Sequence, residues 1–217
     1  MTTTETKAPI VNGVDRQKLF ATVEAVKADP KLATLQFRLF NQWVGGGENR
    51  SRIDGFHGGG QELQHKTPFF LVNDEPEVLL SEDRAPNPVE YVLHALAGCV
   101  VTSMVYHAAA RGIEIKGVTA RLEGDLDLRG FLGLSKGIRP GYRGIRVAFD
   151  IDADCDEAGK SELIALGQAH SPVFDIVTRG VPVSLALEGG ATEAKTEIKT
   201  EAKTETKTAT KTEAKAA

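Results

Sequence analysis

One stretch of the sequence constrains the fold more than any other, the apolar run from Asn87 to Arg111. Asn87 suits a helix N-cap, because its side-chain oxygen can accept a hydrogen bond from a free N–H of the first turn. Pro88 suits the first helical position, since it has no N–H to leave unpaired. Gly112 is expected to end the helix. Almost every face between these limits is apolar or small, which predicts a long, mostly buried helix enclosed by other elements.

The same run has the length of a membrane span. From Tyr91 to Ala110 it carries no formal charge and is long enough to cross a bilayer. Two imidazoles, His94 and His107, interrupt it, and a single span that contains them would insert poorly. We therefore expect the central helix of a globular protein and no membrane partner.

Composition argues against several classes of protein. The chain has 217 residues, 41% of them hydrophobic, and a formal net charge of -4, which predicts a globular protein able to bury a core. It lacks a basic stripe interleaved with aromatic residues, so no nucleic-acid partner is expected. Two cysteines without a secretory signal predict a cytoplasmic location with reduced thiols. No cofactor is expected, and no metal, since Cys, His and carboxylate residues lack zinc-ligand spacing.

Hydrophobic periodicity predicts the other elements. The expected elements are a helix over 15–27, strands over 33–40 and 50–53 joined by a glycine turn, a short strand from Phe69, strands over 113–128 and 145–151, a helix over 157–168, a helical turn or two from Pro172, and a strand over 181–187. This order predicts an α+β domain with helices packed on antiparallel sheet.

Cys99, in the middle of the long helix, has two interpretations. It suits a small core hydrophobe, as free cysteines often are. A reactive thiol, by contrast, must ionise, and an unperturbed cysteine is mostly protonated at neutral pH. Cys99 lies about 16 Å along the helix from Pro88, beyond the reach of the helix dipole. An activating charge must therefore come from another element.

The nearest titratable residues are poor candidates for that role. His107 lies about 12 Å along the helix from Cys99, and His94 lies on a nearly opposite face. We expect both to be hydrogen-bonded helix histidines. Cys155 is surrounded by carboxylates that oppose its ionisation.

The runs Pro86-Asn87-Pro88 and Leu96-Ala97-Gly98-Cys99, followed later by Ser171-Pro172-Val173 and a final Val-Pro-Val, resemble the OsmC/Ohr family. The likeness covers about residues 35–187. The family consists of α+β proteins that reduce organic hydroperoxides through a cysteine pair. The resemblance therefore implies an OsmC-like fold, with antiparallel sheet packed on a long central helix, and an intertwined homodimer.

The resemblance also implies a role for individual residues. Cys99 falls on the peroxidatic thiol of the family. Arg50, or else Arg52, falls on an arginine of the N-terminal hairpin that would activate the thiol. The family's catalytic glutamate directly follows Asn-Pro, where this chain has Val89. Glu90 comes one position later, which turns its side chain by about 100°, and is our candidate to hold the arginine.

The place of the family's resolving cysteine is occupied by Ser171, which cannot form a disulfide. The sequence therefore predicts a one-cysteine peroxidase that reduces organic hydroperoxides, with Cys99 oxidised to sulfenic acid and reduced by an external thiol. The alternative is a non-catalytic relative that binds a small hydrophobic molecule in the dimer cleft. Val89 and Ser171 favour this alternative. Each replaces a catalytic residue of the family, and neither disturbs the hydrophobic core.

On this basis the sequence divides into three segments. Residues 1–32 form a leader and helix, residues 33–188 an OsmC-like domain, and residues 189–217 a tail. The tail repeats Thr-Glu-Ala-Lys with small variations and has no core-forming residue except Ile198, which predicts disorder.

Overall fold

A computed structural model describes residues 10–188 of the chain. Contacts group the chain into two units, Met1–Thr178 and Arg179–Ala217. The leader before residue 10 and the tail predicted to be disordered lie outside the described residues.

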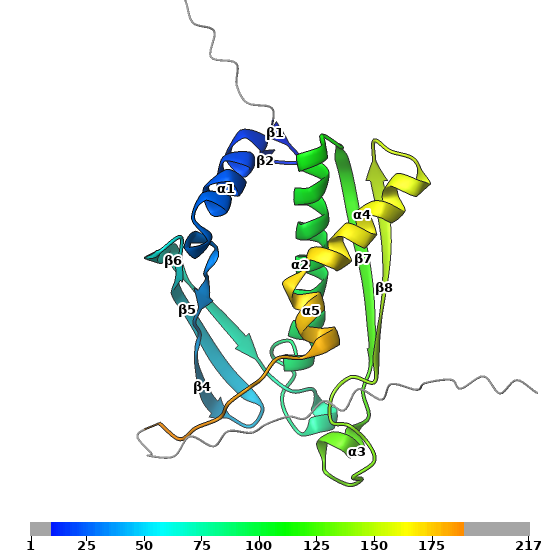
Figure 1. Ribbon diagram of the computed structural model, residues 1–217. Coiled ribbons are helices and arrows are strands. Elements are labelled where there is room, and N and C mark those ends of the chain that lie inside the picture. The colour runs from blue at the N-terminus through cyan, green and yellow to red at the C-terminus, as the bar shows by residue number, and fades with distance from the viewer. Residues whose placement is uncertain (1–9, 189–217) are drawn as a thin grey trace, which may run out of the picture. The chain divides into compact units, whose positions relative to one another are not determined.

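The first unit contains nearly all of the regular structure (Figure 1). In chain order the elements are β1 (Ile10–Val11), β2 (Val14–Asp15), α1 (Arg16–Ala28), the 3-10 turn η1 (Pro30–Ala33), β3 (Gln36–Phe37), β4 (Phe40–Gly45), β5 (Glu48–Gly58), β6 (Gln61–Asn73), the 3-10 turn η2 (Glu77–Leu79), α2 (Pro88–Arg111), β7 (Ile115–Asp125), α3 (Leu128–Phe131), β8 (Gly144–Ala153), α4 (Glu157–His170) and α5 (Pro172–Arg179). Every strand pairing between these elements is antiparallel. The α+β prediction is confirmed.

The described part of the chain begins with a hairpin that was not predicted from the sequence. β1 and β2 are joined by Asn12 and Gly13, whose φ angles are 54° and 75°. Positive φ at both positions is typical of a type I′ turn, for which Asn-Gly is the preferred pair. The Asn12 side chain donates to Ile113 O (3.0 Å) and accepts from Ile115 N (2.8 Å). It thereby fixes the hairpin to the start of β7.

The N-terminal sheet has β5 at its centre. β3 and β4 pair along one edge of β5, and β6 pairs along the other. Gly59 and Gly60, with φ of 58° and 77°, form the turn between β5 and β6. Both strands extend well beyond the predicted segments, because backbone pairing also includes polar stretches such as Gln61–Lys66, which apolar periodicity does not detect.

The strand predicted over residues 33–40 is only partly correct. Pro30 begins η1, so residues 30–33 turn instead of extending. The extended chain is then divided between β3 and β4, with a break at Arg38 and Leu39. A proline fixes φ near the helical value, which favours the turn over a strand start at this point.

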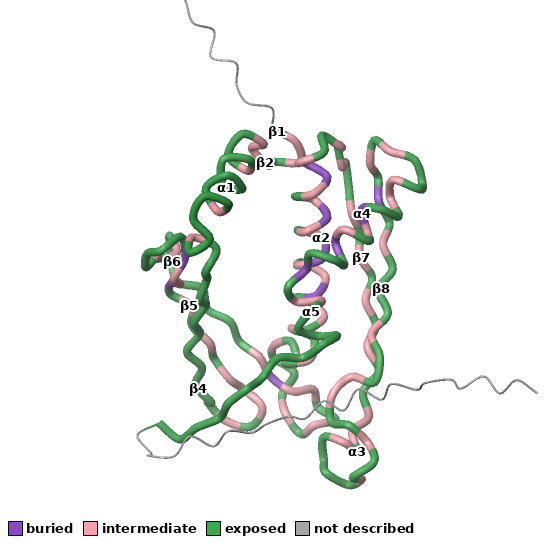
Figure 2. The backbone as a smooth tube through the Cα atoms, in the orientation of Figure 1, coloured by how far each residue is buried: buried purple, intermediate pink, exposed green. Residues whose placement is uncertain are grey.

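α2 has the predicted limits. Asn87 Oδ1 accepts from Val89 N (2.8 Å), and the Glu90 carboxylate accepts from Asn87 N (2.9 Å), which completes a capping box. Gly112 ends the helix with φ 76°. Within the single chain, however, the helix is less buried than predicted. Only one stripe of the helix is buried (Figure 2), formed by Leu96, Val100, Met104, Ala108 and Ala109.

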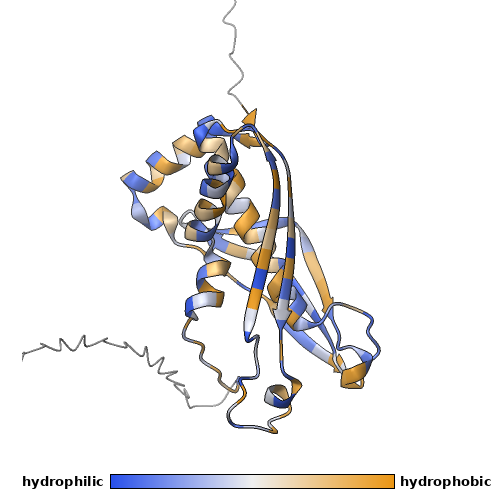
Figure 3. Cartoon of the chain, turned by 90° about the vertical axis from the view of Figure 1, so that its right-hand side faces the viewer, coloured by the Kyte–Doolittle hydropathy of each residue, from blue (hydrophilic) through white to orange (hydrophobic). Residues whose placement is uncertain are grey.

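The buried stripe of α2 packs against α4 and β7. The core contains Met104, Ala108, Ile151 and Leu163. Hydrophobic and hydrophilic residues alternate along the two long strands β7 and β8 (Figure 3), so that one face of the pair joins this core. α2 is therefore covered on one side by the rest of its own chain.

The strand predicted over residues 181–187 is not formed. Only Leu185 makes an isolated bridge, and Leu185 and Leu187 remain 76% and 82% exposed. Alternating apolar residues give a stable strand only where a neighbouring strand supplies hydrogen bonds along its length. In the described part of the second unit the segment lacks this pairing.

Candidate functional site

Cys99 lies halfway along α2 and is a free thiol. It is partly buried, next to Val100 of the buried stripe and Gly98 on the exposed side. The sulfur-bearing position is therefore at the boundary between the face of α2 that its own chain covers and the face that it leaves open.

α4 crosses α2 close to Cys99. A Cβ added at Gly167 would lie 2.9 Å from Val100 O, so the absence of a side chain at this position lets the two helices approach closely. Further along α4, His170 O accepts a hydrogen bond from Ser103 Oγ (3.1 Å). These two contacts bring the end of α4 against the turn of α2 that contains Cys99.

Ser171, which the sequence motifs predict at the resolving position, directly follows His170 and is 3% exposed. Its Oγ accepts from Phe174 N (3.1 Å), which caps the start of α5. The hydroxyl thus has a structural role beside the turn of Cys99.

Arg50 forms an ion pair that the sequence analysis missed. Its guanidinium lies 2.7 Å from Glu48 Oε1. The Glu48 side chain is only 12% exposed, and its second oxygen lies 3.6 Å from Arg84 Nη1. One largely buried carboxylate therefore contacts two guanidinium groups. The pairing of Arg50 with Glu48 could have been predicted from the sequence, because residues two apart on a strand face the same side.

Arg52, the second candidate, follows on the same strand. It pairs with Asp54 (2.7 Å), and both side chains are about half exposed. Exposed pairs of this kind hold a side chain only weakly. Of the two arginines, Arg50 has the less exposed carboxylate partner.

Glu90 has a different environment from the one expected. Its carboxylate accepts the N–H of Asn87 in the capping box. It lies near Tyr142, whose pKa is raised by burial and by the charge of Glu90. The Tyr142 hydroxyl donates to Val89 O (2.9 Å), which ties the first turn of α2 to the connection between β7 and β8.

Cys99, Arg50 and Glu90 are not brought together within the described part of one chain. No hydrogen bond or ion pair joins any two of them across residues 10–188. The roles assigned to these three residues from the sequence remain predictions.

The loop that follows β6 positions Arg84 beside Glu48. Asp74 is 1% exposed and accepts hydrogen bonds from Ser81 Oγ (2.5 Å), Arg84 N (3.1 Å) and Glu75 N (2.9 Å). These bonds lower the pKa of Asp74, because they stabilise its ionised form. A buried, ionised carboxylate thus organises the loop around a polar pocket of about 290 Å³, whose lining includes Glu48.

Two histidines contact each other where α2 and α4 pack together. The rings of His107 and His170 stack with centroids 4.2 Å apart. The pKa of His107 is lowered, first by burial and then by the electrostatic effects of His170 and Arg111. Within residues 10–188 no group of three or more His, Cys, Asp or Glu side chains is placed to hold a metal ion.

A model of the OsmC-like protein family matches residues 81–186. This part of the chain is therefore OsmC-like. The match includes α2 with Cys99 and the start of α5 with Ser171, and it confirms the family predicted from the sequence motifs. No curated protein sequence matches this OsmC-like chain significantly.

Solved structures are also similar to it. An OsmC-like protein from Mycoplasma pneumoniae has a TM-score of 0.52 and 14% identity, over 66% of this chain and 88% of that one. A putative osmotic stress induced and detoxification response protein from Psychrobacter arcticus has a TM-score of 0.49 and 14% identity, over 65% and 88%. An organic hydroperoxide resistance protein OsmC from Legionella pneumophila has a TM-score of 0.39 and 16% identity, over 67% and 92%. The Mycoplasma structure shows the OsmC-like fold.

Among the described helices of this OsmC-like chain, α2 is long and apolar enough to cross a membrane by length and composition. The core helix of a globular protein passes the same test. Because α2 lies inside the family match and packs on α4 and β7, it is the central helix of the fold.

Proposed function

We propose that this OsmC-like protein is a cytoplasmic thiol peroxidase that reduces organic hydroperoxides with Cys99 as its only reacting thiol. One observation carries the proposal. The family helix keeps a partly buried free thiol in the middle of α2, and the end of α4 that packs on this turn supplies a hydroxyl, Ser171. A serine cannot resolve a sulfenic acid, so the second half of the cycle needs an external thiol.

The proposed reaction has an oxidative half and a reductive half. The Cys99 thiolate attacks one peroxide oxygen, so an S–O bond forms, the O–O bond breaks, and the alcohol leaves after taking a proton. Cys99 is oxidised to sulfenic acid and the hydroperoxide is reduced. An external thiol then attacks the sulfenic sulfur and releases water, which leaves a mixed disulfide. A second external thiol releases Cys99, and the reductant leaves as a disulfide.

We assign Arg50 to stabilise the thiolate and the departing oxygen, since a guanidinium favours both negative charges. Glu48 is the carboxylate that holds Arg50, because it is largely buried and already paired with it. We prefer Glu48 to Glu90, the candidate from the sequence for this role, because Glu90 already accepts the N–H of Asn87 in the capping box. We assign the meeting of Arg50 with Cys99 to the assembled dimer.

The homodimer is part of the proposal. Phe69 and Phe70 are 50% and 72% exposed on β6, and because they are consecutive they face opposite sides of the sheet. Both faces of the N-terminal sheet and the open face of α2 thus leave large apolar groups uncovered, which soluble monomers rarely do. Sedimentation equilibrium should give twice the chain mass. A monomer at all concentrations would contradict this part of the proposal.

The chemistry is tested with reduced protein, an equimolar organic hydroperoxide such as cumene hydroperoxide, and dimedone as a trap for sulfenic acid. The wild type and Cys155→Ser should each lose one thiol rapidly and carry the adduct at Cys99 by peptide mass spectrometry. Cys99→Ser should remain unmodified. Absence of any adduct in the wild type would overturn the proposal.

Arg50 is tested against Arg52, which offers a matched control on the same strand. Arg50→Gln should slow oxidation of Cys99 by about 100-fold to 1000-fold, the usual effect of removing one group that stabilises developing negative charge. Arg52→Gln should change the rate little. Equal rates for both variants would remove Arg50 from the site.

A second candidate function is supported by Ser171 and Glu90, whose hydrogen bonds cap helices and thus have a structural explanation. Under this alternative the protein binds a small hydrophobic molecule in the dimer cleft and Cys99 only packs. The same trapping experiment separates the two functions. No adduct, together with saturable binding of a hydrophobic fluorescent probe to the dimer, favours the binding protein.

A further inference from the structure

The connection between β7 and β8, residues 126–143, is a preformed loop. Arg143 N donates to Asp125 O (2.8 Å) at its base, and Leu134 N donates to Arg129 O (2.9 Å) within it. A Cβ added at Gly130 would lie 2.3 Å from Arg139 O, so the two limbs of the loop are in direct contact. Backbone contacts within the loop therefore hold its shape, and Tyr142 near its end ties it to α2.

This loop turns its largest apolar side chains outward. Phe131, Leu132 and Leu134 form an apolar tip, and they are 59%, 53% and 70% exposed. A self-packed loop that keeps three neighbouring apolar groups in water is a typical sign of an interaction surface.

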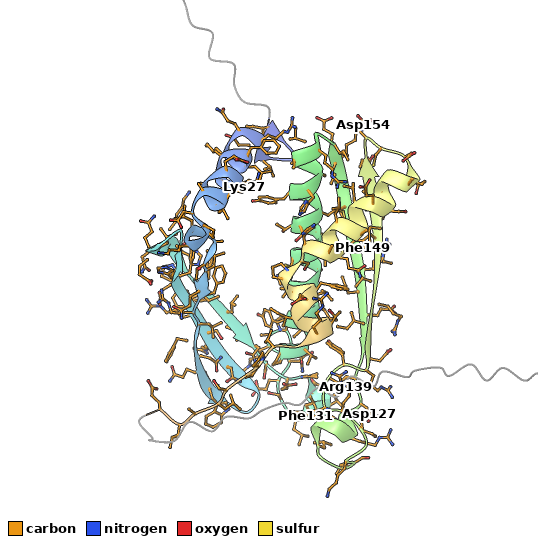
Figure 4. The ribbon with its side chains drawn as sticks, viewed as in Figure 1. Lys27, Asp127, Phe131, Arg139, Phe149 and Asp154 are labelled. Carbon is orange, nitrogen blue, oxygen red and sulfur yellow. The ribbon has the colours of Figure 1, made fainter. Side chains whose placement is uncertain are left out.

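Basic residues surround the apolar tip. Lys136 and Arg139 are exposed and have no ion pair within the described residues. Arg129 and Arg143 share the single acidic residue of the loop, Asp127, at 2.7 and 3.9 Å. The loop is therefore positively charged in a protein whose formal net charge is -4. Figure 4 shows Phe131, Arg139 and Asp127 at the same end of the β7–β8 pair.

We propose that the β7–β8 loop docks on an anionic phospholipid surface, with the apolar tip inserted below the headgroups and Lys136 and Arg139 at the level of the phosphates. Apolar groups rimmed by basic ones are the pattern of peripheral membrane contacts. A nucleic acid fits less well, because leucines cannot stack on bases. A second copy of this loop fits less well, because like charges would meet.

This contact is peripheral and needs no transmembrane helix. No membrane partner was expected from the sequence, because α2 is unsuited to span a membrane. The proposed contact differs from that expectation, since it is made at the membrane surface by a loop. Membrane docking does not depend on the chemistry of Cys99, so its test is independent of the test of the peroxidase proposal.

The test measures sedimentation of the full-length protein with vesicles of phosphatidylcholine alone or mixed with phosphatidylglycerol. We expect binding to the mixed vesicles that weakens as salt is added, and little binding to the neutral ones. Lys136→Gln with Arg139→Gln should weaken binding about 30-fold, since each basic residue near an anionic surface is worth about a fivefold factor. Phe131→Ser with Leu134→Ser should weaken it by about tenfold or more at every salt concentration.

Matched controls lie elsewhere on the chain. Lys66→Gln with Arg121→Gln removes the same charge away from the loop, and Val78→Ser removes an exposed apolar group. Both should bind vesicles as the wild type does. Absence of binding to anionic vesicles, or equal losses in the controls, would overturn the proposal. So would a change in sedimentation velocity of the Phe131→Ser, Leu134→Ser protein that shows a lost dimer, because the tip would then contact a second copy.

Discussion

Replacing Ser171 with cysteine should give Cys99 an internal partner. Ser171 directly follows His170, whose carbonyl oxygen accepts a hydrogen bond from Ser103 on the next turn of α2. A disulfide needs Cα atoms closer than about 7 Å. We expect the packing of the end of α4 on this turn to meet that requirement once peroxide has oxidised Cys99.

The magnitude follows from two opposing effects. In the reduced state Ser171→Cys should cost about 1–2 kcal/mol, because the hydroxyl that caps α5 is lost and a larger sulfur enters a buried site. A disulfide between positions 99 and 171 closes a long loop, and the lost chain entropy raises the free energy of the unfolded state by about 4 kcal/mol. The free energy of unfolding of the oxidised variant should therefore exceed that of the wild type by about 2–3 kcal/mol, which raises Tm by about 4–12 °C.

The assay is thermal unfolding followed by circular dichroism, before and after one equivalent of hydroperoxide, with and without dithiothreitol. A Cys155→Ser background prevents the other thiol from pairing. The control Ser171→Cys with Cys99→Ser cannot close the loop and should show only the loss expected for the reduced state. If peptide mapping finds Cys99 oxidised but no link to position 171, the inference that the two sites are adjacent is wrong.

Three further predictions concern stability. Leu163→Ala, at a fully buried core position, should lower the free energy of unfolding in urea by about 3–4 kcal/mol, whereas the exposed Leu187→Ala should stay within about 0.5 kcal/mol. Since folding lowers the pKa of His107, its stabilising contribution is complete above the unfolded pKa near 6.5 and is lost as pH falls towards the folded pKa. His107→Gln should therefore flatten the decline of Tm below about pH 6.5. Asn12→Ala removes two hydrogen bonds to the start of β7, and should cost about 1–3 kcal/mol and speed amide exchange there.

Features that depend on neighbouring residues in the sequence could be predicted. The limits of α2 follow from Asn87, Pro88 and Gly112, because capping is a contact between residues of one turn. The Asn12-Gly13 hairpin was missed although its turn signal is local, and a search for type I′ pairs would have found it.

Features that depend on packing between elements could not be predicted. The contact of Arg84 with Glu48 depends on how the loop after β6 folds back onto β5. The approach of α4 to Cys99 depends on the helix crossing at Gly167, which in the sequence is only one of many glycines. Periodicity identifies a buried face but not the element that covers it.

The exposure of α2 within the single chain has a physical explanation that supports the dimer. The sequence of α2 is apolar or small on almost every face, and such a helix is stable in water only when it is enclosed. Its own chain covers one stripe and leaves Val92 and Tyr106 partly exposed. The N-terminal sheet likewise exposes apolar side chains, because Phe69 and Phe70 are exposed on its two faces. We infer that a second copy supplies both missing contacts, which would also bring the strand of Arg50 to a helix that carries Cys99.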